Sequence, residues 1–399
     1  MEWWAGRRQS PSLLATPQNG NKRGVIIMLY REFGKTGIKM SVLGFGAMRL
    51  PTEEKNGVST MDTEESIKII LKGFKLGINY IDTAFIYGDS EVVVGKALKQ
   101  WKDRVYLSTK TFVGNFEKRG DYRRRLEEQL KRLDVSCIDF YHFHSISYND
   151  FEEKIKRLKL IKEAEKAQRE NLIKHISFST HDKPEGIKKI IEEGEVFTSM
   201  LCQYNLLDRV NEGIMKFASE KGLAVVVMGP VGGGRLTHSE LLMKEVGGKC
   251  STTPELALRF VFSNPYVTTV ISGMSNLDMV EENVSVASIK KPLTNQELTS
   301  LNRFIEKRKT KEEIPCTGCN YCLPCPKGVT IPYIFQLMNY AKVYGLKELA
   351  ISRYSNIKST EEVEREKADA CVECGQCEEK CPQKIDIISQ LKKIHKTLN

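Results

Sequence analysis

The chain has 399 residues, of which 41% are hydrophobic and 28% are charged, and its formal net charge is +10. This length can hold one large domain with an appendage. No apolar run reaches the ~18 residues that a membrane-spanning helix needs, so we expect no membrane association. The basic residues are spread along the chain among Asp and Glu, a pattern that does not indicate a nucleic-acid partner.

Residues 1–27 lack a periodic pattern and are rich in Ser, Pro, Asn and Gly, which predicts a disordered N-terminal extension. The apolar run Val25–Ile27 is too short for the core of a secretory signal, so we expect a cytoplasmic protein. Our hypothesis is that the natural protein begins at Met28 and that the residues before it are translated from an earlier start.

From residue 41 onward, short apolar strands alternate with amphipathic helices, the pattern of βα units. We predict eight strands, at residues 41–48, 79–84, 105–110, 138–144, 173–180, 199–205, 224–230 and 268–272. The helices predicted between them include residues 63–76, 90–102, 119–133, 151–170 and 183–193. Eight such units close a barrel, so the predicted fold class is an α/β protein with a (β/α)8 TIM barrel. No G-x-G-x-x-G follows the first strand, which argues against a Rossmann dinucleotide site.

Polar side chains end three of the early strands. Asp82 ends the second predicted strand, and Tyr87 follows on the next loop. Lys110 ends the third strand, and His144 ends the fourth. Taken singly, each is better explained as a core residue or a solvated strand end. Together, at the face where barrel enzymes carry out their chemistry, they can protonate a carbonyl oxygen as hydride arrives.

The order and surroundings of these residues resemble the aldo-keto reductase family, whose catalytic tetrad would be Asp82, Tyr87, Lys110 and His144. The resemblance implies that Tyr87 donates a proton to the carbonyl oxygen and that the Lys110 ammonium favours the resulting phenolate. It also implies that Asp82 holds Lys110 in place. His144 would orient the carbonyl group and stabilise the developing negative charge.

The resemblance also implies a nicotinamide nucleotide site. Ser179 and Gln203 match the family's ligands of the nicotinamide carboxamide, although Thr180 replaces the usual asparagine. The glycines after the seventh strand permit close approach to a pyrophosphate, and the loop after the eighth opens onto a helix N-terminus. The other implied cofactor-binding residues are Gly229, Pro230, Val231, Gly232, Gly234, Leu236, Ser272, Gly273, Ser275, Asn276, Glu282 and Asn283. Met279 stands where many members carry an arginine for the 2′-phosphate, so both NADP(H) and NAD(H) stay open.

The composition changes at Pro315, after two further helices predicted at 276–287 and 295–309. Two cysteine motifs follow, formed by Cys316, Cys319, Cys322 and Cys325 and by Cys371, Cys374, Cys377 and Cys381. Cysteines at every third residue let one turn of chain present several thiolates to a [4Fe-4S] cluster. Helices predicted at 333–350 and 360–370 lie between the motifs, as in an α-helical dicluster ferredoxin.

The predicted tail therefore holds two [4Fe-4S] clusters, each completed by the cysteine that precedes a proline in the other motif. Cys316, Cys319, Cys322 and Cys381 would bind one cluster, and Cys371, Cys374, Cys377 and Cys325 the other. The first motif departs from the usual pattern, with two residues before Cys325 instead of three. The alternative is a pair of zinc sites, but zinc ribbons pair one C-x2-C with a distant second one.

The resemblance covers residues 28–310 as an aldo-keto reductase barrel and 311–399 as a dicluster ferredoxin-like domain, which together resemble the iron–sulfur branch of the family. Its first segment, Met28–Gly37, resembles the hairpin that closes the bottom of the family's barrel. The implied function is to reduce a small-molecule carbonyl, or oxidise an alcohol, with two clusters for electron transfer. Hydride carries two electrons together while each cluster carries one, so a flavin is a further candidate cofactor.

Two alternatives remain open at the level of sequence. One is a reductase that takes electrons from a ferredoxin-type redox partner and uses no nicotinamide. The other is a non-catalytic protein that keeps the barrel for redox sensing or binding. The complete tetrad counts against the second alternative.

Overall fold

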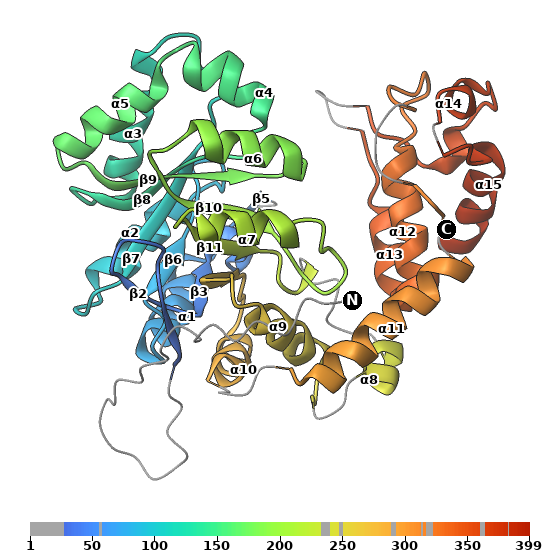
Figure 1. The fold of residues 1–399 in the computed structure, drawn as a ribbon, viewed down its shortest axis with the longest axis horizontal. Helices are drawn as coiled ribbons and strands as arrows, with labels where there is room; N and C mark the ends of the chain where they lie inside the picture. The colour runs from blue at the N-terminus through green and yellow to red at the C-terminus, as the bar shows by residue number, and fades with distance from the viewer. Residues whose placement is uncertain are drawn as a thin grey trace. The chain divides into compact units, whose positions relative to one another are not determined.

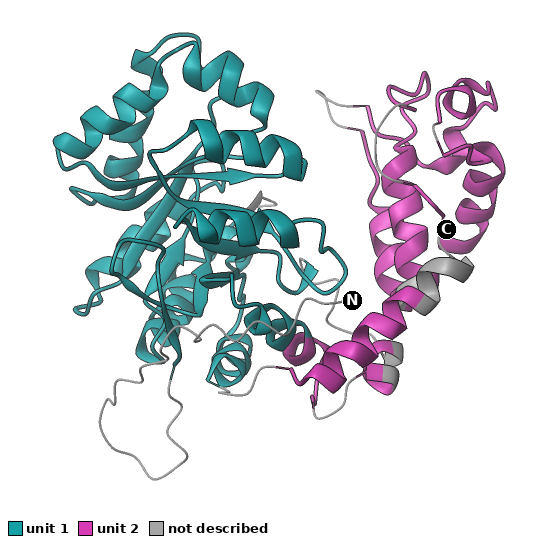
Figure 2. Cartoon of the chain, viewed as in Figure 1, with its two compact units in different colours: residues 1–233, 257–292 teal, residues 234–256, 293–399 magenta. Residues whose placement is uncertain are grey.

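The computed structural model describes residues 28–55, 58–232, 240–246, 250–288, 293–312, 314–316, 322–359, 364–381 and 383–399. The chain divides into two compact units (Figure 2). The first comprises Met1–Gly233 and Ala257–Pro292, and the second comprises Gly234–Leu256 and Leu293–Asn399. The N-terminal extension predicted at residues 1–27 lies outside the described residues.

The first unit is built on a closed barrel of eight parallel strands (Figure 1). In chain order they are β3 (Leu43–Gly46), β6 (Tyr80–Asp82), β7 (Tyr106–Thr111), β8 (Ile138–Phe143), β9 (Ile173–Thr180), β10 (Phe197–Gln203), β11 (Ala224–Met228) and β12 (Thr269–Ser272). Each strand pairs with the next, and β12 pairs with β3 to close the barrel. All eight predicted strands are confirmed, and their ends differ from the prediction by at most two residues.

Helices follow the strands and surround the barrel (Figure 1). They are α1 (Thr63–Lys75), α2 (Ser90–Lys99), α3 (Gly120–Leu133), α4 (Tyr148–Asp150), α5 (Leu160–Arg169), α6 (Pro184–Glu193), α7 (Glu212–Glu220), α9 (Thr253–Ser263) and α10 (Leu277–Ala287). Two short hairpins accompany them, β1 (Tyr30–Glu32) with β2 (Lys39–Ser41) and β4 (Thr52–Lys55) with β5 (Val58–Met61).

The single helix predicted over residues 151–170 is wrong. The chain forms a π-helical turn at Phe151–Lys156, adopts a left-handed conformation at Lys159 (φ 55°), and begins α5 at Leu160. Phe151, Ile155 and Leu160 are all buried. The five-residue step from Ile155 to Leu160 would rotate one of them away from the core in a regular helix, so the break lets both pack inward.

The first hairpin covers the amino ends of the barrel strands, as its resemblance implies. Phe33, between β1 and β2, is fully buried and packs with Met40 against Tyr80 and Phe140 at the bottom of the barrel. The Phe33 and Phe140 ring centroids lie 4.4 Å apart. This aromatic plug closes one end, so a small molecule has to enter the barrel from the carboxyl ends of the strands.

The second unit is helical, with α8 (Glu240–Val246), α11 (Asn295–Glu312), α12 (Ile331–Tyr344), α13 (Lys347–Ser355), α14 (Gln376–Glu379) and α15 (Ile387–Leu398). The helix predicted over residues 333–350 is two helices, because Gly345 ends α12 in a left-handed conformation (φ 68°). None of the described helices combines the length and apolar character needed to cross a lipid bilayer.

The helix predicted at 360–370 is also wrong in its described part. Glu366 forms a parallel bridge with Val329, and its backbone N–H donates to Gly328 O at 2.9 Å. Thr330 N donates back to Glu366 O at 3.3 Å. These long-range backbone hydrogen bonds hold the segment extended, so only Ala368–Ala370 forms a short 3-10 turn.

Candidate functional site

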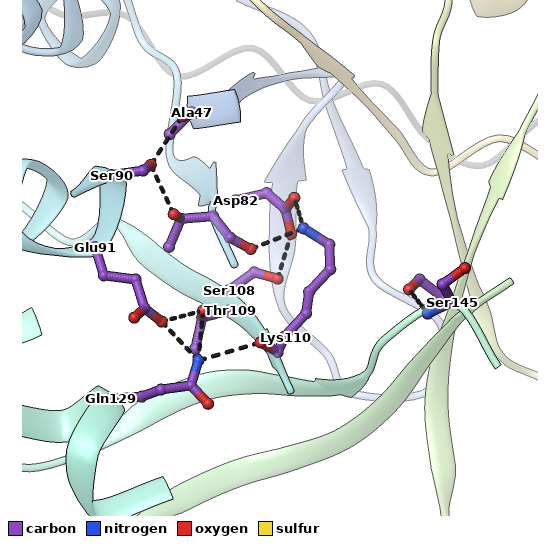
Figure 3. A network of polar contacts seen from close by, with 11 residues as sticks. Ala47, Asp82, Ser90, Glu91, Ser108, Thr109, Lys110, Gln129 and Ser145 are labelled. Carbon is purple, nitrogen blue, oxygen red and sulfur yellow. Dashed lines mark hydrogen bonds and ion pairs between the residues drawn. The ribbon is translucent and has the colours of Figure 1, made fainter. Parts of the chain in front are cut away.

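The centre of the barrel site is a buried ion pair between Asp82 and Lys110 (Figure 3). Their side chains are 2% and 1% exposed. Asp82 also accepts a hydrogen bond from Ser108 Oγ at 2.7 Å, and Lys110 Nζ donates to Thr83 O at 2.7 Å. Burial disfavours the Lys110 ammonium, but the Asp82 carboxylate outweighs that effect and raises the pKa of Lys110 above its ordinary value. The lysine is therefore held as a fixed positive charge.

Tyr87 and His144 lie beside this pair. The half-buried Tyr87 ring has its centroid 5.0 Å from Lys110 Nζ. His144 packs edge-on against Tyr87, with ring centroids 6.0 Å apart and an interplanar angle of 87°. Burial and the nearby Lys110 charge lower the pKa of His144 to about 3, so its imidazole is neutral at ordinary pH. The structure thus brings the four residues of the predicted tetrad together at the carboxyl ends of three adjacent strands.

A second histidine, His142, lies one pleat deeper on β8 and pairs in register with Lys110 on β7. It is fully buried, and neither ring nitrogen has a hydrogen-bond partner within the part of the chain that the structure describes. Burial and the Lys110 charge lower the pKa of His142 to about 3. A neutral ring at this position packs in the barrel without adding a second positive charge beside Lys110.

The residues predicted to hold the carboxamide lie on the neighbouring strands. Ser179, on β9, accepts a hydrogen bond from Ser145 N at 2.7 Å. Gln203 ends β10 and donates from Nε2 to Asp208 Oδ2 at 3.1 Å. Gly229 follows β11 with φ 64°, and a Cβ there would lie 3.4 Å from Gln203 Oε1. All three predicted residues stand at the same end of the barrel as the tetrad.

The predicted phosphate and adenine residues lie after β11 and β12. Ser272 ends β12 and accepts a hydrogen bond from Asn283 Nδ2 at 3.2 Å, which ties α10 to the strand. Asn276 caps α10 by accepting from Met279 N at 2.8 Å. The remaining described residues of this group, on the two loops or the first turns of α10, are Pro230, Val231, Gly232, Gly273, Ser275 and Glu282. Gly234 and Leu236 lie outside the described residues.

In the second unit, five cysteines from both motifs line one cavity: Cys322, Cys325, Cys371, Cys374 and Cys377. Among the described residues that line it there is no carboxylate or imidazole, and two lysines are present. Left-handed conformations at Glu373 (φ 56°) and Gly375 (φ 75°) turn the chain between the cysteines of the second motif. Cysteine thiolates are the ligands that an iron–sulfur cluster requires, so this lining fits one.

The cavity contains Cys325 with Cys371, Cys374 and Cys377, the grouping expected for one of the two clusters, but it also contains Cys322, which was expected to bind the other. Of the other cluster's predicted ligands, Cys316 is half-buried, Cys381 is buried, and Cys319 lies outside the described residues. Across the described ranges, no three His, Cys, Asp or Glu side chains converge tightly enough to bind a single metal ion. The described thiols thus line a cavity and do not converge on the position of a single ion.

Comparison with known proteins identifies both parts of the chain. Residues 42–251, more than half of the chain, match the model of the aldo/keto reductase family. The chain belongs to this family. Residues 315–385 match the 4Fe-4S dicluster domain. The predicted family, the barrel followed by a helical cluster-bearing tail, and the assignment as an oxidoreductase enzyme are therefore confirmed.

Alignments of this aldo/keto reductase with several relatives span most of each relative's length. The uncharacterized oxidoreductase YqkF of Bacillus subtilis is 27% identical over 326 residues, covering 72% of this chain and 98% of its own. L-galactose dehydrogenase of Arabidopsis thaliana is 26% identical over 290 residues, covering 65% and 88%. The holo structure of the aldo-keto reductase AKR11C1 from Bacillus halodurans is 29% identical with a TM-score of 0.60, covering 69% and 96%.

Sequence reasoning missed one cationic residue at the reductase's candidate phosphate loop. Arg49 is the last residue of the 3-10 turn Ala47–Arg49 that follows β3, and a Cβ added to Gly273 would lie 3.3 Å from its Cβ and Cδ atoms. The arginine stem therefore runs over Gly273, just before the α10 N-terminus. No sequence signal points to this contact, because β3 and β12 become neighbours only through closure of the barrel.

Proposed function

We propose that this protein reduces a small-molecule carbonyl compound, or oxidises the corresponding alcohol, by exchanging hydride with a nicotinamide nucleotide. The observation that carries the proposal is the placement of Tyr87 between a buried lysine ammonium and a neutral histidine. When bound, the nucleotide would supply hydride to the carbonyl carbon. The remaining chemistry, which is to deliver a proton and stabilise charge, belongs to side chains of the barrel.

In the direction of reduction, the Tyr87 hydroxyl gives its proton to the carbonyl oxygen as hydride reaches the carbon. The Lys110 ammonium stabilises the phenolate left behind, and Asp82 keeps that ammonium in place. The His144 Nδ1 atom is buried and has no hydrogen-bond partner among the described residues, and we propose that Nε2 faces the substrate oxygen. Water returns the proton to Tyr87, and the products are the alcohol and the oxidised nucleotide.

We further propose that residues 28–310 form the reductase domain and residues 311–399 bind two [4Fe-4S] clusters that carry electrons. The cavity lined by Cys325, Cys371, Cys374 and Cys377 supports the binding of one cluster across both motifs. Each bound cluster would exchange one electron at a time. Because hydride carries two electrons, we propose a flavin at the barrel mouth as the cofactor that couples hydride transfer to one-electron transfer by the clusters. The proposed redox partner is a ferredoxin-type protein.

For nucleotide binding, Ser179 and Gln203 are proposed to hold the carboxamide. The loops after β11 and β12 are proposed to hold the phosphates, with Arg49 as a further cation there. Arg49→Ala should weaken nucleotide binding without changing the apparent affinity for substrate. Isothermal titration with NADPH and with NADH measures this directly, and the nucleotide that loses more affinity identifies the phosphate that the arginine contacts.

The proposed electron path is tested by anaerobic titration of the cluster-loaded protein with NADPH and then NADH, while the visible absorption of the clusters is followed. Bleaching by one nucleotide supports a path from barrel to tail and identifies the nucleotide. If only dithionite bleaches the clusters, the nicotinamide nucleotide does not supply them with electrons. A reductase that takes its electrons from a ferredoxin-type donor then explains the protein better.

The proposed chemistry is tested by Tyr87→Phe, which removes one hydroxyl group. We expect carbonyl turnover to fall by roughly 100-fold or more, the usual range for loss of a general acid, with nucleotide affinity retained. Tyr106→Phe is a matched control, because Tyr106 begins β7 at the opposite end of the barrel. Equal turnover by Tyr87→Phe and wild type would remove Tyr87 from the mechanism.

A further inference from the structure

Outside the tetrad, the barrel contains another buried carboxylate, that of Glu91. This second residue of α2 has a side chain that is 0% exposed. Its Oε1 atom accepts hydrogen bonds from Thr109 Oγ1 at 2.7 Å and from Gln129 Nε2 at 2.6 Å. Its Oε2 atom accepts from Arg132 Nε at 2.9 Å. A buried charge persists only where such partners satisfy it, so this carboxylate is a fixed junction between α2, α3 and β7.

One arm of the junction leads to Lys110. Thr109 precedes Lys110 on β7, so the two side chains point to opposite faces of the strand. Gln129 Nε2 also donates to the Lys110 backbone O at 3.2 Å, and Tyr141 OH donates to Gln129 Oε1 at 2.6 Å. Figure 3 shows the contacts of Gln129 with Glu91 and Lys110 beside the Asp82–Lys110 pair. The network therefore holds β7 from outside at the point where Lys110 projects inward.

The other arm leads to the loop that carries Tyr87, which we call the Tyr87 loop (residues 85–89). Arg132 Nη2 donates to the carbonyl oxygen of Gly88. Phe85 N donates to Lys110 O at 3.2 Å, and the Phe85 ring centroid lies 5.4 Å from Arg132 Cζ. Both sides of Tyr87 are thus attached to groups that Glu91 organises.

We propose that Glu91 is a positioning residue that fixes the Tyr87 loop against the strand carrying Lys110. The inference rests on the proposed roles of Tyr87 and Lys110, because it concerns the distance between them. Without the carboxylate, Arg132 loses its counter-ion and its hold on Gly88 O. The Tyr87 loop then moves relative to Lys110, and a displacement of about 1 Å from proton-transfer geometry reduces turnover by roughly 100-fold.

The test compares Glu91→Gln with a matched control, Asp139→Asn. Asp139 is also a buried carboxylate between β7 and β8, ion-paired with Arg104 and accepting from Leu107 N at 2.8 Å. It lies toward the amino end of β7, away from the Tyr87 loop. Both variants lose one buried charge, but only Glu91→Gln removes a contact that positions Tyr87.

Two readouts are needed. In Glu91→Gln we expect kcat and kcat/KM to fall together by roughly 10- to 100-fold with unchanged nucleotide affinity, because the lost alignment matters in the transition state. We also expect faster hydrogen–deuterium exchange in a peptide spanning residues 84–90, whose Phe85, Tyr87 and Ser90 amides are hydrogen-bonded in the native structure. Asp139→Asn should leave both readouts at the wild-type level.

The inference is overturned if the amides of residues 84–90 in Glu91→Gln exchange hydrogen for deuterium at the wild-type rate, whatever happens to the melting temperature of the variant. A fall in kcat that Asp139→Asn reproduces also overturns it. If the wild type reduces no carbonyl substrate, the proposed function has failed, and the exchange comparison still decides whether Glu91 holds the loop.

Discussion

Replacing Lys110 with methionine keeps the length and the apolar stem of the side chain but removes the buried ammonium. The Asp82 carboxylate, 2% exposed, would keep the Ser108 hydroxyl at 2.7 Å and lose its counter-ion. Thr83 O would lose the donor that now lies at 2.7 Å. The variant should therefore lose both activity and stability, and the stability loss tests the energetic account of the site.

Removing one partner of a buried ion pair costs about 3–5 kcal/mol, because the other charge stays desolvated. A domain of this size changes its Tm by roughly 2–4 °C per kcal/mol, so we expect a fall of about 6–20 °C. Adding Asp82→Asn removes the stranded charge and leaves an acceptor for Ser108. The double variant should recover much of the loss, with a coupling energy of about 2–3 kcal/mol.

The loss should also depend on pH. In Lys110→Met, burial raises the pKa of Asp82 with no ammonium to oppose it. A carboxyl whose folded pKa exceeds its unfolded value of about 3.9 stabilises the fold only while protonated, and this contribution disappears as pH rises through the folded pKa. The deficit relative to wild type should therefore be smaller near pH 5 than near pH 8.

Thermal unfolding followed by tryptophan fluorescence measures these effects. Trp101, whose ring centroid lies 5.8 Å from that of Phe74, reports on the barrel unit once Trp3 and Trp4 are replaced by phenylalanine throughout the series. A loss below about 1 kcal/mol, or strictly additive effects in the double variant, would refute a tightly coupled buried pair.

Three further outcomes are expected. His142→Phe should gain stability relative to wild type as pH falls from about 6.5 toward 3. The reason is that His142, with its pKa lowered to about 3, stays neutral in the folded protein but is protonated in the unfolded chain over this range. A pH-independent difference in unfolding free energy, measured by urea titration, would contradict this. Cys325→Ser should lower the iron content, measured by elemental analysis, from about eight to about four atoms per chain. The control variant Cys137→Ser should keep the wild-type iron content. Equal iron content in the two variants would remove Cys325 from the ligand set. Gly95→Ala should destabilise the barrel by about 1–3 kcal/mol in thermal unfolding, because a Cβ there would lie 2.1 Å from Leu133 O; a wild-type Tm would show that α2 and α3 separate without cost.

Much of the site could be predicted from sequence because its parts are encoded locally. Each barrel strand is a short apolar run bounded by polar residues, and Asp82, Lys110 and His144 stand where such runs end. Cysteine spacing likewise encodes the cluster motifs within a few residues. Parallel strands in a barrel place their carboxyl ends on one face, so finding the strands was enough to bring the tetrad together.

Local patterns failed where contacts distant in sequence determined the outcome. The segment before Ala368 contains good helix formers, yet backbone hydrogen bonds between Glu366 and residues 328–330 keep it extended. The apolar positions at 151–170 fit a helix, but burying both Ile155 and Leu160 required a break. In each case the energy of long-range packing exceeded a weak local propensity.

The sequence by itself determined the family, the order of the barrel strands, and which side chains we propose for the proton-transfer chemistry. The tertiary structure decided which groups surround them. Closure of β12 onto β3 brought Arg49 over Gly273, and the packing of α2 and α3 on β7 buried the Glu91 carboxylate behind Lys110. The physical reason is that hydrophobic periodicity depends on residues within one element, whereas burial and charge pairing depend on elements that meet only after the chain has folded.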